Sequence, residues 1–369
     1  MRRTSITVSH ALAGLVLMFV LLSGMQVQGR AAVRTGLEGK TLSVLGDSIS
    51  TYTGVSNNSS RNNTIGKNLV YYTPGLEGIY QRDTWWQQTV DSFGMRLLVN
   101  NSWSGSCMFM TGAGTLGAYQ QRCVQLHSSN GIPPNIIAVY LGTNDQDYFA
   151  DTLGTYAAID FDSLIVPGET GFTYAAPETC MEAYAIALHK ILQRYPSAEV
   201  YCFTLLQRPV LTPVSVLSFN VELEKLAEHY DVYVVDLMRC GVYAAEPAYD
   251  LLMGDYVHPN PWGMDAITCA FRDALLANSR YVSEDLQLYV AEYDLNRVTV
   301  KQGTARVLVA GEGFRIDLEP FGEEEPLSVT VTMGGKDITA AAWREKSIVI
   351  EQVTGDVHIT ASAITPDKS

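Results

Sequence analysis

Five short, largely apolar runs alternate with amphipathic stretches between residues 41 and 237, and this alternation constrains the fold more than any other feature. Nearly continuous apolar runs are typical of parallel strands that helices cover on both faces. Apolar residues between the runs recur at helical spacing, as from Met181 to Leu192. The pattern predicts an α/β fold with three layers and a doubly wound parallel sheet. The expected strands are Leu42–Leu45, Leu97–Asn100, Ile136–Leu141, Val200–Leu205 and Val232–Leu237.

The rhythm changes after about residue 292, where short apolar runs follow one another as strands without intervening helices. Gly334 and Gly335 lie between two of these runs and are typical of a tight hairpin turn. We therefore expect an α/β domain over residues 38–285 and a small β-sandwich-like domain over residues 292–364.

The N-terminus has the composition of an export signal. Arg2 and Arg3 precede the apolar stretch Ala11–Met25, and small residues follow it. We expect a signal peptide over residues 1–29 and a secreted or cell-surface protein; an uncleaved signal anchor is the alternative. The formal net charge of −14 argues against binding nucleic acid. Six cysteines leave the disulfide pairing open, although Cys107 and Cys123 are the first pair to consider.

Two separated runs together provide the residue types that acyl transfer requires. Ser48 follows the first expected strand, and His258 comes three residues after Asp255 and directly before Pro259. A serine hydroxyl is a weak nucleophile until a base accepts its proton, and that base must be oriented by an acid. On its own, Gly-Asp-Ser is more often a surface turn, so the chemistry depends on the two runs meeting in the fold.

Hydrogen-bond donors follow the second and third expected strands, at the sheet edge where Ser48 should lie. Gly105 would allow close backbone approach and expose an N–H, and Asn144 carries a side-chain amide that could face a developing oxyanion. The run Asp145–Asp147 could suggest a metal site, but no further ligands stand nearby in the sequence. We expect neither a metal nor a cofactor.

In order and placement, these blocks resemble the SGNH hydrolase family, also called GDSL esterases and lipases, over about residues 40–280. The resemblance implies a flavodoxin-like fold with Ser48 as the nucleophile, His258 as the base and Asp255 as its orienting acid. It also implies an oxyanion hole formed by the N–H groups of Ser48 and Gly105 and the side chain of Asn144. Ile49 departs from the family name, which has Leu there. The C-terminal segment is similar to small β modules of secreted bacterial surface and carbohydrate-active enzymes.

The segments Tyr52–Tyr80 and Asp151–Thr173 are longer than in compact family members and are expected to form walls of the substrate pocket. Aromatic side chains pack well on sugar rings, whereas a long acyl chain needs an aliphatic groove. We therefore expect an exported esterase that removes short acyl groups, notably acetyl, from a carbohydrate. The aromatic residues of the expected wall are Tyr52, Tyr71, Tyr72, Tyr80, Trp85, Trp86 and Trp103. Trp85 and Trp86 begin an expected helix, so we expect at least one of these two to belong to the core.

Two alternatives stay open. The first is a lipase, lysophospholipase or thioesterase that uses the same triad. The second is a non-catalytic surface-binding protein that retains the motif. In the favoured interpretation, the partner is an acylated small molecule or glycan, and the C-terminal domain could contact a cell surface or a polysaccharide.

Overall fold

The computed structural model describes residues 34–56, 69–109, 117–207, 213–240, 247–321 and 327–363. From Thr35 onward the chain forms one compact unit. The expected signal peptide, residues 1–29, lies outside the described residues. In the part of the chain that the model describes, no helix is long and apolar enough to cross a membrane.

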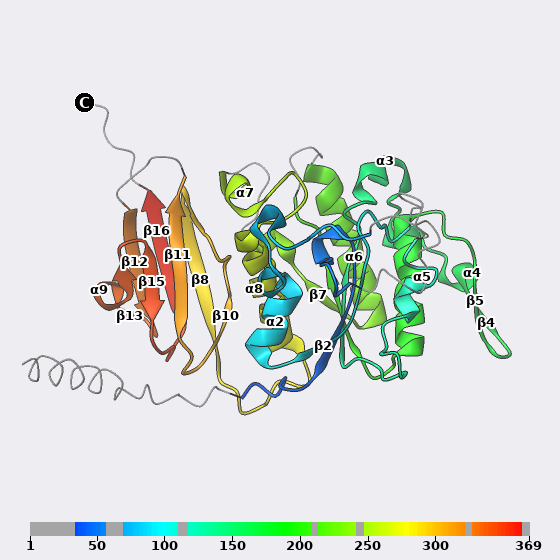
Figure 1. Ribbon diagram of the computed structural model, residues 1–369, viewed down its shortest axis with the longest axis horizontal. Coiled ribbons are helices and arrows are strands. Elements are labelled where there is room, and N and C mark those ends of the chain that lie inside the picture. Colours follow the sequence, from blue (N-terminus) through cyan, green and yellow to red (C-terminus); the bar gives the residue numbers. More distant parts are fainter. Residues whose placement is uncertain are drawn as a thin grey trace, which may run out of the picture. The chain divides into compact units, whose positions relative to one another are not determined.

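A five-stranded parallel sheet forms the centre of the α/β region, in the order β2-β1-β3-β6-β7 (Figure 1). This is the flavodoxin-like order of a doubly wound sheet, so the predicted fold class is confirmed. Each strand overlaps an expected apolar run. The strands are β1 (Thr41–Gly46), β2 (Arg96–Ser102), β3 (Ile136–Tyr140), β6 (Glu199–Phe203) and β7 (Tyr233–Val235).

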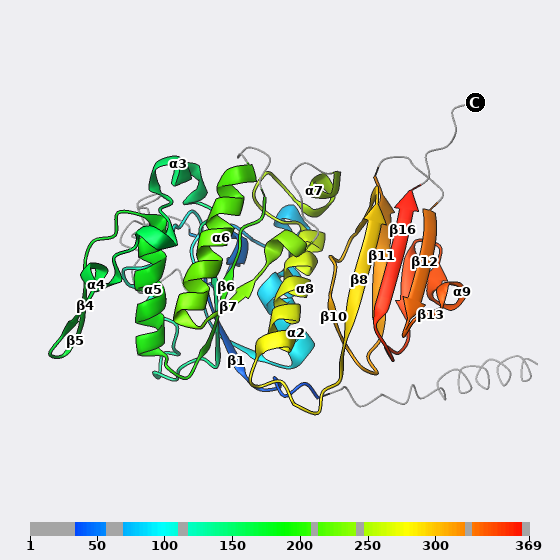
Figure 2. The same ribbon diagram turned by 180° about the vertical axis from the view of Figure 1, so that it is seen from behind.

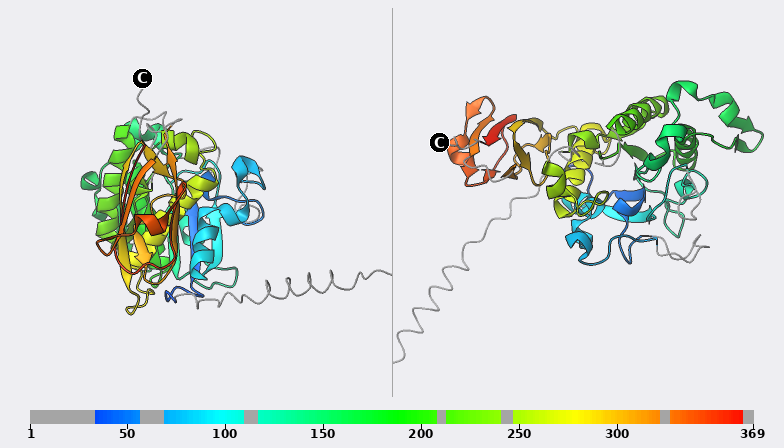
Figure 3. Two further views of the ribbon diagram at one scale, coloured as in Figure 1. Left: turned by 90° about the vertical axis from the view of Figure 1, so that its left-hand side faces the viewer. Right: turned by 90° about the horizontal axis from the view of Figure 1, so that it is seen from above.

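Helices cover both faces of this sheet. Figures 1 and 2 show α2 and α8 packed together on one face and α5 and α6 on the other. The short helices α3, α4 and α7 and the hairpin β4–β5 lie in the connections, and the hairpin extends away from α5 (Figure 3). The bounds are α2 (Trp85–Phe93), α3 (Phe149–Thr152), α4 (Phe161–Leu164), β4 (Ile165–Gly168), β5 (Gly171–Tyr174), α5 (Cys180–Arg194), α6 (Pro213–Tyr230), α7 (Pro247–Leu252) and α8 (Pro261–Asn278).

Aromatic side chains fill the space between the sheet and the α2–α8 layer. Phe203 of β6 lies 5.0 Å from Trp85, 5.1 Å from Tyr140 and 5.1 Å from Phe271, measured between ring centroids. All four side chains are fully buried. Aromatic pairs at such distances add to the free energy gained by burying their area, so this cluster fixes α2 and α8 against β3 and β6.

The C-terminal region forms two mainly antiparallel sheets, ordered β10-β8-β16-β12-β13 and β14-β15-β11-β9, with an apolar core between them. The expectation of a β-sandwich-like region is confirmed, and Gly334 and Gly335 form its tight hairpin turn with φ of 56° and 75°. The first strand begins at Leu288, ahead of the expected start; the domain limits stay a prediction. The elements are β8 (Leu288–Asn296), β9 (Val298–Val300), β10 (Val307–Val309), β11 (Phe314–Pro320), β12 (Leu327–Met333), β13 (Lys336–Asp337), α9 (Thr339–Ala342), β14 (Trp343–Arg344), β15 (Ser347–Ile350) and β16 (Val357–Ala363).

Helix α8 connects this β region to the α/β region. The carboxylate of Asp273 accepts the backbone N–H groups of Arg306 at 2.7 Å and Val307 at 3.0 Å. The Cα of Ala266 lies so close to Gly303 that a side chain at Gly303 would collide with it. The backbone of the loop before β10 therefore rests directly on α8.

The six cysteines all lie among the described residues, and none of them forms a disulfide. Cys107 and Cys123, the pair considered first for a disulfide, are both buried and are not joined. The packed core makes a crosslink unnecessary for a chain of this size.

The start of α8 depends on a glycine at Gly263. Asn260 caps the helix by accepting the N–H groups of Trp262 and Gly263, while its own N–H donates to the carbonyl of Leu252 at 3.1 Å. A Cβ at Gly263 would collide with that same carbonyl. The first turn of α8 therefore packs on the end of α7 without any side chain between them.

We predict that Gly263→Ala lowers the free energy of unfolding by about 1–3 kcal/mol, because the added methyl group must displace backbone. Denaturant unfolding measures the change. Gly313→Ala is the matched control, because a Cβ there would meet its nearest atom at an ordinary 3.5 Å. Equal stability of the two variants would contradict the close packing of α8 on Leu252.

Candidate active site

The first three strands bring the expected site segments to one edge of the sheet. Strands β1, β2 and β3 are neighbours and parallel, so their carboxyl ends lie side by side. Ser48 begins a 3-10 turn directly after β1, and Trp103 after β2 donates its N–H to the carbonyl of Gly46 at 3.1 Å. A Cβ at Gly46 would lie 2.7 Å from the Ser50 and Ser102 hydroxyls, so glycine is required there.

A buried arginine, Arg122, joins the ends of β1 and β2. Its guanidinium donates to the carbonyls of Gly46 at 3.3 Å and Asn101 at 2.8 Å, and to the Ser106 hydroxyl at 2.7 Å. Burial lowers the pKa of Arg122 to about 10, which still leaves it cationic at neutral pH. The guanidinium therefore fixes the loop that carries Gly105 against the end of β1, the strand that precedes Ser48.

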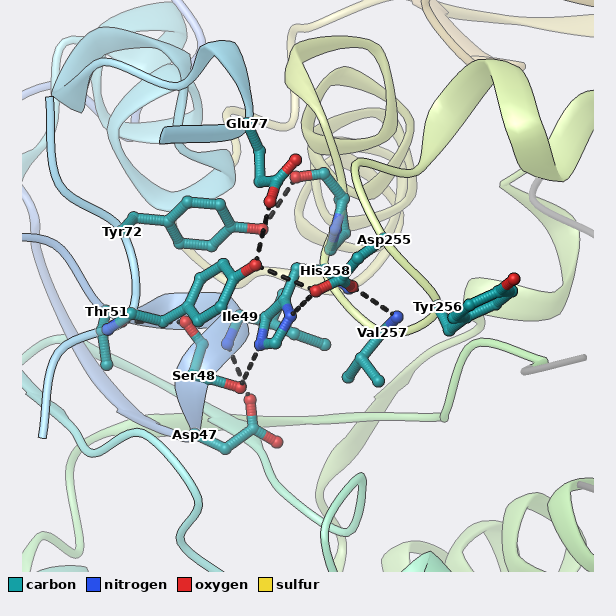
Figure 4. A network of polar contacts seen from close by, with 12 residues as sticks. Asp47, Ser48, Ile49, Thr51, Tyr72, Glu77, Asp255, Tyr256, Val257 and His258 are labelled. Carbon is teal, nitrogen blue, oxygen red and sulfur yellow. Dashed lines mark hydrogen bonds and ion pairs between the residues drawn. The ribbon is translucent and has the colours of Figure 1, made fainter. Parts of the chain in front are cut away.

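Ser48, His258 and Asp255 form one chain of hydrogen bonds (Figure 4). His258 Nε2 lies 2.9 Å from Ser48 Oγ, and His258 Nδ1 lies 2.8 Å from Asp255 Oδ2. The sequence separates Ser48 from the other two by more than 200 residues, and the fold brings them together. This geometry allows a hydroxyl proton to pass to an imidazole whose other nitrogen faces a carboxylate.

The turn that carries Asp255 and His258 is closed by its own backbone. Asp255 Oδ1 accepts the N–H groups of Val257 at 2.7 Å and His258 at 2.6 Å, and Gly254 donates to the His258 carbonyl at 2.8 Å. Partial burial raises the pKa of Asp255, but the hydrogen bonds from His258 and Val257 outweigh it, so the pKa lies below its ordinary value. The carboxylate is therefore ionised beside His258.

Gly105 and Asn144 lie on connected loops at this edge. Gly105 has φ of 73°, a conformation that glycine adopts readily. The Asn144 side-chain nitrogen donates to the carbonyl of the next residue, Ser106, at 2.9 Å. An amide nitrogen carries two hydrogens, so Asn144 retains a second donor while it holds the Gly105 loop.

Asp145, part of the run that suggested a metal site, holds a loop in place. Its buried carboxylate accepts the N–H groups of Met108 at 2.7 Å and Phe109 at 2.9 Å. Among the described residues, no group of three or more His, Cys, Asp or Glu side chains could hold a metal ion. Asp145 therefore anchors the loop that follows Gly105.

Most of the expected aromatic wall is core, and that expectation is wrong. Five of its seven members are buried, because their rings fill space beneath the loops and between α2 and the sheet; they are Tyr52, Tyr72, Trp85, Trp86 and Trp103. Tyr80 is exposed, and Tyr71 contacts the triad, as described below. The sequence did not single out Tyr256, which is 69% exposed and directly follows Asp255.

The two longer segments have different surroundings. Within Tyr52–Tyr80, residues 57–68 lie outside the described residues. Tyr71 of the same segment contacts Asp255. The segment Asp151–Thr173 instead packs on α6: Tyr156 donates its N–H to Glu222 at 2.7 Å, and the ring of Phe161 stacks on His229. It also lines a cavity of about 580 Å³ between α3 and α6 that contains no triad residue.

Sequence reasoning placed Tyr71 in the pocket wall but missed its contacts with Asp255 and Glu77. The Tyr71 hydroxyl lies 2.9 Å from Asp255 Oδ2 and 3.1 Å from Glu77 Oε1. The polar composition of the segment is the only sequence signal for Glu77, and it does not indicate a contact with a turn about 180 residues away.

Asp47, directly before Ser48, is a fully buried carboxyl group. Burial raises its pKa to about 7, against the opposing effects of the Ile49 N–H, the Thr143 hydroxyl and the charge of Arg122. Because this pKa exceeds the ordinary value of 3.8, the folded state holds a proton that the unfolded state releases between these two pH values. The contribution of Asp47 to stability is thus full below pH 4 and is lost as the pH rises through about 7.

We predict that Asp47→Asn gains stability relative to the wild type as the pH rises, because the amide has no proton to lose. Between pH 5 and pH 8 the difference in the free energy of unfolding should shift by roughly 2–3 kcal/mol in favour of the variant. Denaturant unfolding at several pH values measures this. Asp162→Asn, at an exposed position of α4, controls for the loss of one negative charge. A difference that stays constant with pH would contradict the raised pKa.

The α/β region is similar to a known protein family. The family model of the GDSL-like lipases/acylhydrolases matches residues 40–269, more than half of the chain. None of the curated proteins matches it. A Bacteroides ovatus structure assigned as a GDSL-like lipase is 23% identical and covers 65% of this chain and 100% of its own, with a TM-score of 0.46.

Two further solved structures are similar over about the same share of the chain. A carbohydrate esterase family 3 protein from Talaromyces cellulolyticus is 15% identical, covering 66% of this chain and 100% of its own (TM-score 0.41). Est24, a carbohydrate acetylesterase from Sinorhizobium meliloti, is 14% identical, covering 64% and 99% (TM-score 0.42). From the family match over residues 40–269, the chain belongs to the GDSL-like lipases/acylhydrolases, the SGNH family that it resembles, and is a serine ester hydrolase.

Proposed function

We propose that Ser48, His258 and Asp255 are the catalytic triad of this hydrolase. The observation that carries the proposal is the unbroken chain of hydrogen bonds from Ser48 Oγ through His258 to Asp255. His258 accepts the Ser48 proton as Oγ attacks the ester carbonyl, and then donates it to the leaving alcohol. Water activated by the same imidazole hydrolyses the acyl-enzyme and restores Ser48.

In this proposal the oxyanion hole consists of the N–H groups of Ser48 and Gly105 and the side chain of Asn144. All three donors follow neighbouring parallel strands, and the Asn144–Ser106 hydrogen bond joins two of the loops. Donors held in advance stabilise the charge that develops on the carbonyl oxygen without reorganising during the reaction. The buried guanidinium of Arg122 also holds the Gly105 loop, because it donates a hydrogen bond to the Ser106 hydroxyl.

The proposed substrate is a short acyl ester, notably acetyl, on a neutral carbohydrate. Polar groups surround His258, including the Asp255 and Glu77 carboxylates and the Tyr71 hydroxyl. Exposed Tyr256 offers an aromatic face beside the triad, on which a sugar ring could pack. A groove of about 580 Å³ between α3 and α6 is lined by none of the triad residues, so it is not the acyl pocket of this proposal.

Export is part of the proposal, and it rests on the sequence of residues 1–29. A glycan on a cell surface or in the medium is accessible to an exported esterase. N-terminal sequencing of the mature protein from the medium and from the membrane fraction distinguishes a cleaved signal from a retained anchor.

We predict that Ser48→Ala lowers kcat by about 10⁴- to 10⁶-fold, because it removes the nucleophile. The measurement is hydrolysis of p-nitrophenyl esters from acetate to palmitate and of acetylated glycans. Ser92→Ala, at an exposed position of α2, is the matched control and should keep full activity. Residual activity of Ser48→Ala near that of the control would rule out the triad. A preference for palmitate over acetate would replace the carbohydrate esterase by a lipase or thioesterase.

We predict that Asn144→Ala lowers kcat by roughly 10²- to 10³-fold with a smaller change in KM, because an oxyanion donor acts mainly in the transition state. Steady-state kinetics on an acetyl ester measure both constants. Since Asn144 also holds Ser106, the thermal unfolding midpoint is recorded as a control for loosening of the loop. A change in KM alone would place Asn144 in substrate binding instead.

A further inference from the structure

One tyrosine contacts two members of the triad at once. The ring of Tyr71 stacks on the imidazole of His258 with centroids 3.4 Å apart and an interplanar angle of 9°. Its hydroxyl donates to Asp255 Oδ2 at 2.9 Å, the same oxygen that faces His258 Nδ1. The backbone of Tyr71 is itself fixed, since its N–H donates to the Thr51 hydroxyl at 2.9 Å.

Asp255 needs such a partner because it is open to solvent. The Asp255 side chain is 39% exposed, whereas that of His258 is 13% exposed. Solvent screens an exposed charge and leaves its side chain free to rotate. Backbone N–H groups hold Oδ1, so the hydroxyl of Tyr71 is the group that fixes Oδ2 in line with the imidazole.

Glu77 approaches the same hydroxyl from the other side (Figure 4). Its Oε1 lies 3.1 Å from the Tyr71 oxygen, so one phenol proton is shared between two carboxylates. Burial first, and then the hydrogen bond and the charge of Asp255, raise the pKa of Tyr71 well above its ordinary value. Tyr71 therefore remains a donor throughout the working range of an esterase.

We propose that Tyr71 is a positioning residue: its ring holds the His258 imidazole, its hydroxyl holds the Asp255 carboxylate, and Glu77 acts on both through that hydroxyl. The kinetic consequences rest on the proposed function. The two halves of the side chain have separable effects. The electron-rich ring face favours the imidazolium that forms in the transition state, and the hydroxyl restricts the carboxylate.

The groups that face His258 determine how its titration responds. Among the described residues, the titratable ones are Asp255 on its own turn, Tyr71, Glu77 behind Tyr71, and Tyr72, whose ring lies edge-on 6.1 Å away. Asp47 lies below Ser48 in Figure 4. The Tyr71 ring favours the charged imidazole. A variant without the ring should therefore lose the His258 proton at a lower pH than the wild type does.

The experiment compares Tyr71→Phe, which keeps the ring, with Tyr71→Leu, which removes it. The readouts are kcat and KM on an acetyl ester, the acid limb of kcat/KM against pH, and NMR titration of the His258 ring in the full chain. Tyr71→Leu should move both titration midpoints down by about half a pH unit and lower kcat about tenfold or more. Tyr71→Phe should leave the midpoints within about 0.2 pH unit of wild type and lower kcat about 3- to 10-fold at unchanged KM.

Two more variants complete the design. Glu77→Gln should alter kcat less in the Tyr71→Phe background than in the wild type, because the hydrogen bond to the hydroxyl is absent there and only the packing of Glu77 on Gly254 remains. Tyr233→Phe is the matched control: it removes a phenol at the start of β7, at the sheet edge opposite Ser48, and should behave as wild type. Circular dichroism checks that each variant is folded.

Unchanged NMR midpoints in Tyr71→Leu would overturn the role of the ring, and an unchanged kcat in Tyr71→Phe would overturn the role of the hydroxyl. These failures differ from a failure of the proposed function, in which hydrolysis persists in Ser48→Ala. Because the NMR titration needs no turnover, it tests the Tyr71–His258 contact in either case.

Discussion

The buried guanidinium of Arg122 is the interaction on which the site depends. It donates to the last residue of β1, to β2 and to the loop beyond β2, so three segments share one charge. Burying a cation is costly unless hydrogen bonds and an opposite charge compensate it. The hydrogen bonds of Arg122 do not depend on the ionisation of Asp47, and the charge of Asp47 adds to them as the pH rises through about 7. If the cation were removed, the carbonyls and the hydroxyl that it holds would lose their donors inside the protein. The hydrogen bonds of Arg122 therefore keep Ser48 and Gly105 in their relative positions.

A second set of contacts holds His258. His258 lies between the end of α7 and the start of α8, where Asn260 caps one helix and bonds back to Leu252 of the other. This short segment cannot shift without breaking the cap of α8. His258 is thus held by helix ends, whereas Ser48 follows the end of a strand, and the two meet at the edge of the sheet.

Much of this arrangement could be predicted from the sequence, because the determining signals are local. The apolar runs predicted all five strands of the sheet, and the spacing of Asp255 and His258 predicted that they would pair on one turn. The contacts of Tyr71, Glu77 and Arg122 could not be predicted, because each depends on residues that only the fold brings near. Tyr52 and Trp103 were misassigned to the pocket wall for the same reason: an aromatic residue in a polar segment has the same sequence signature whether it points inward or outward.

The contact between Asp273 and the loop before β10 has a consequence for how the protein melts. Burial raises the pKa of Asp273 to about 6, so its two backbone donors stabilise a carboxylate that would be costly to bury alone. If the β strands came apart first, α8 would keep this carboxylate without its donors and would lose its cover over Ala266. Unfolding of the β region therefore weakens the helix that follows His258. The two regions should therefore unfold together on heating, in one cooperative transition by calorimetry, although their sheets share no strand.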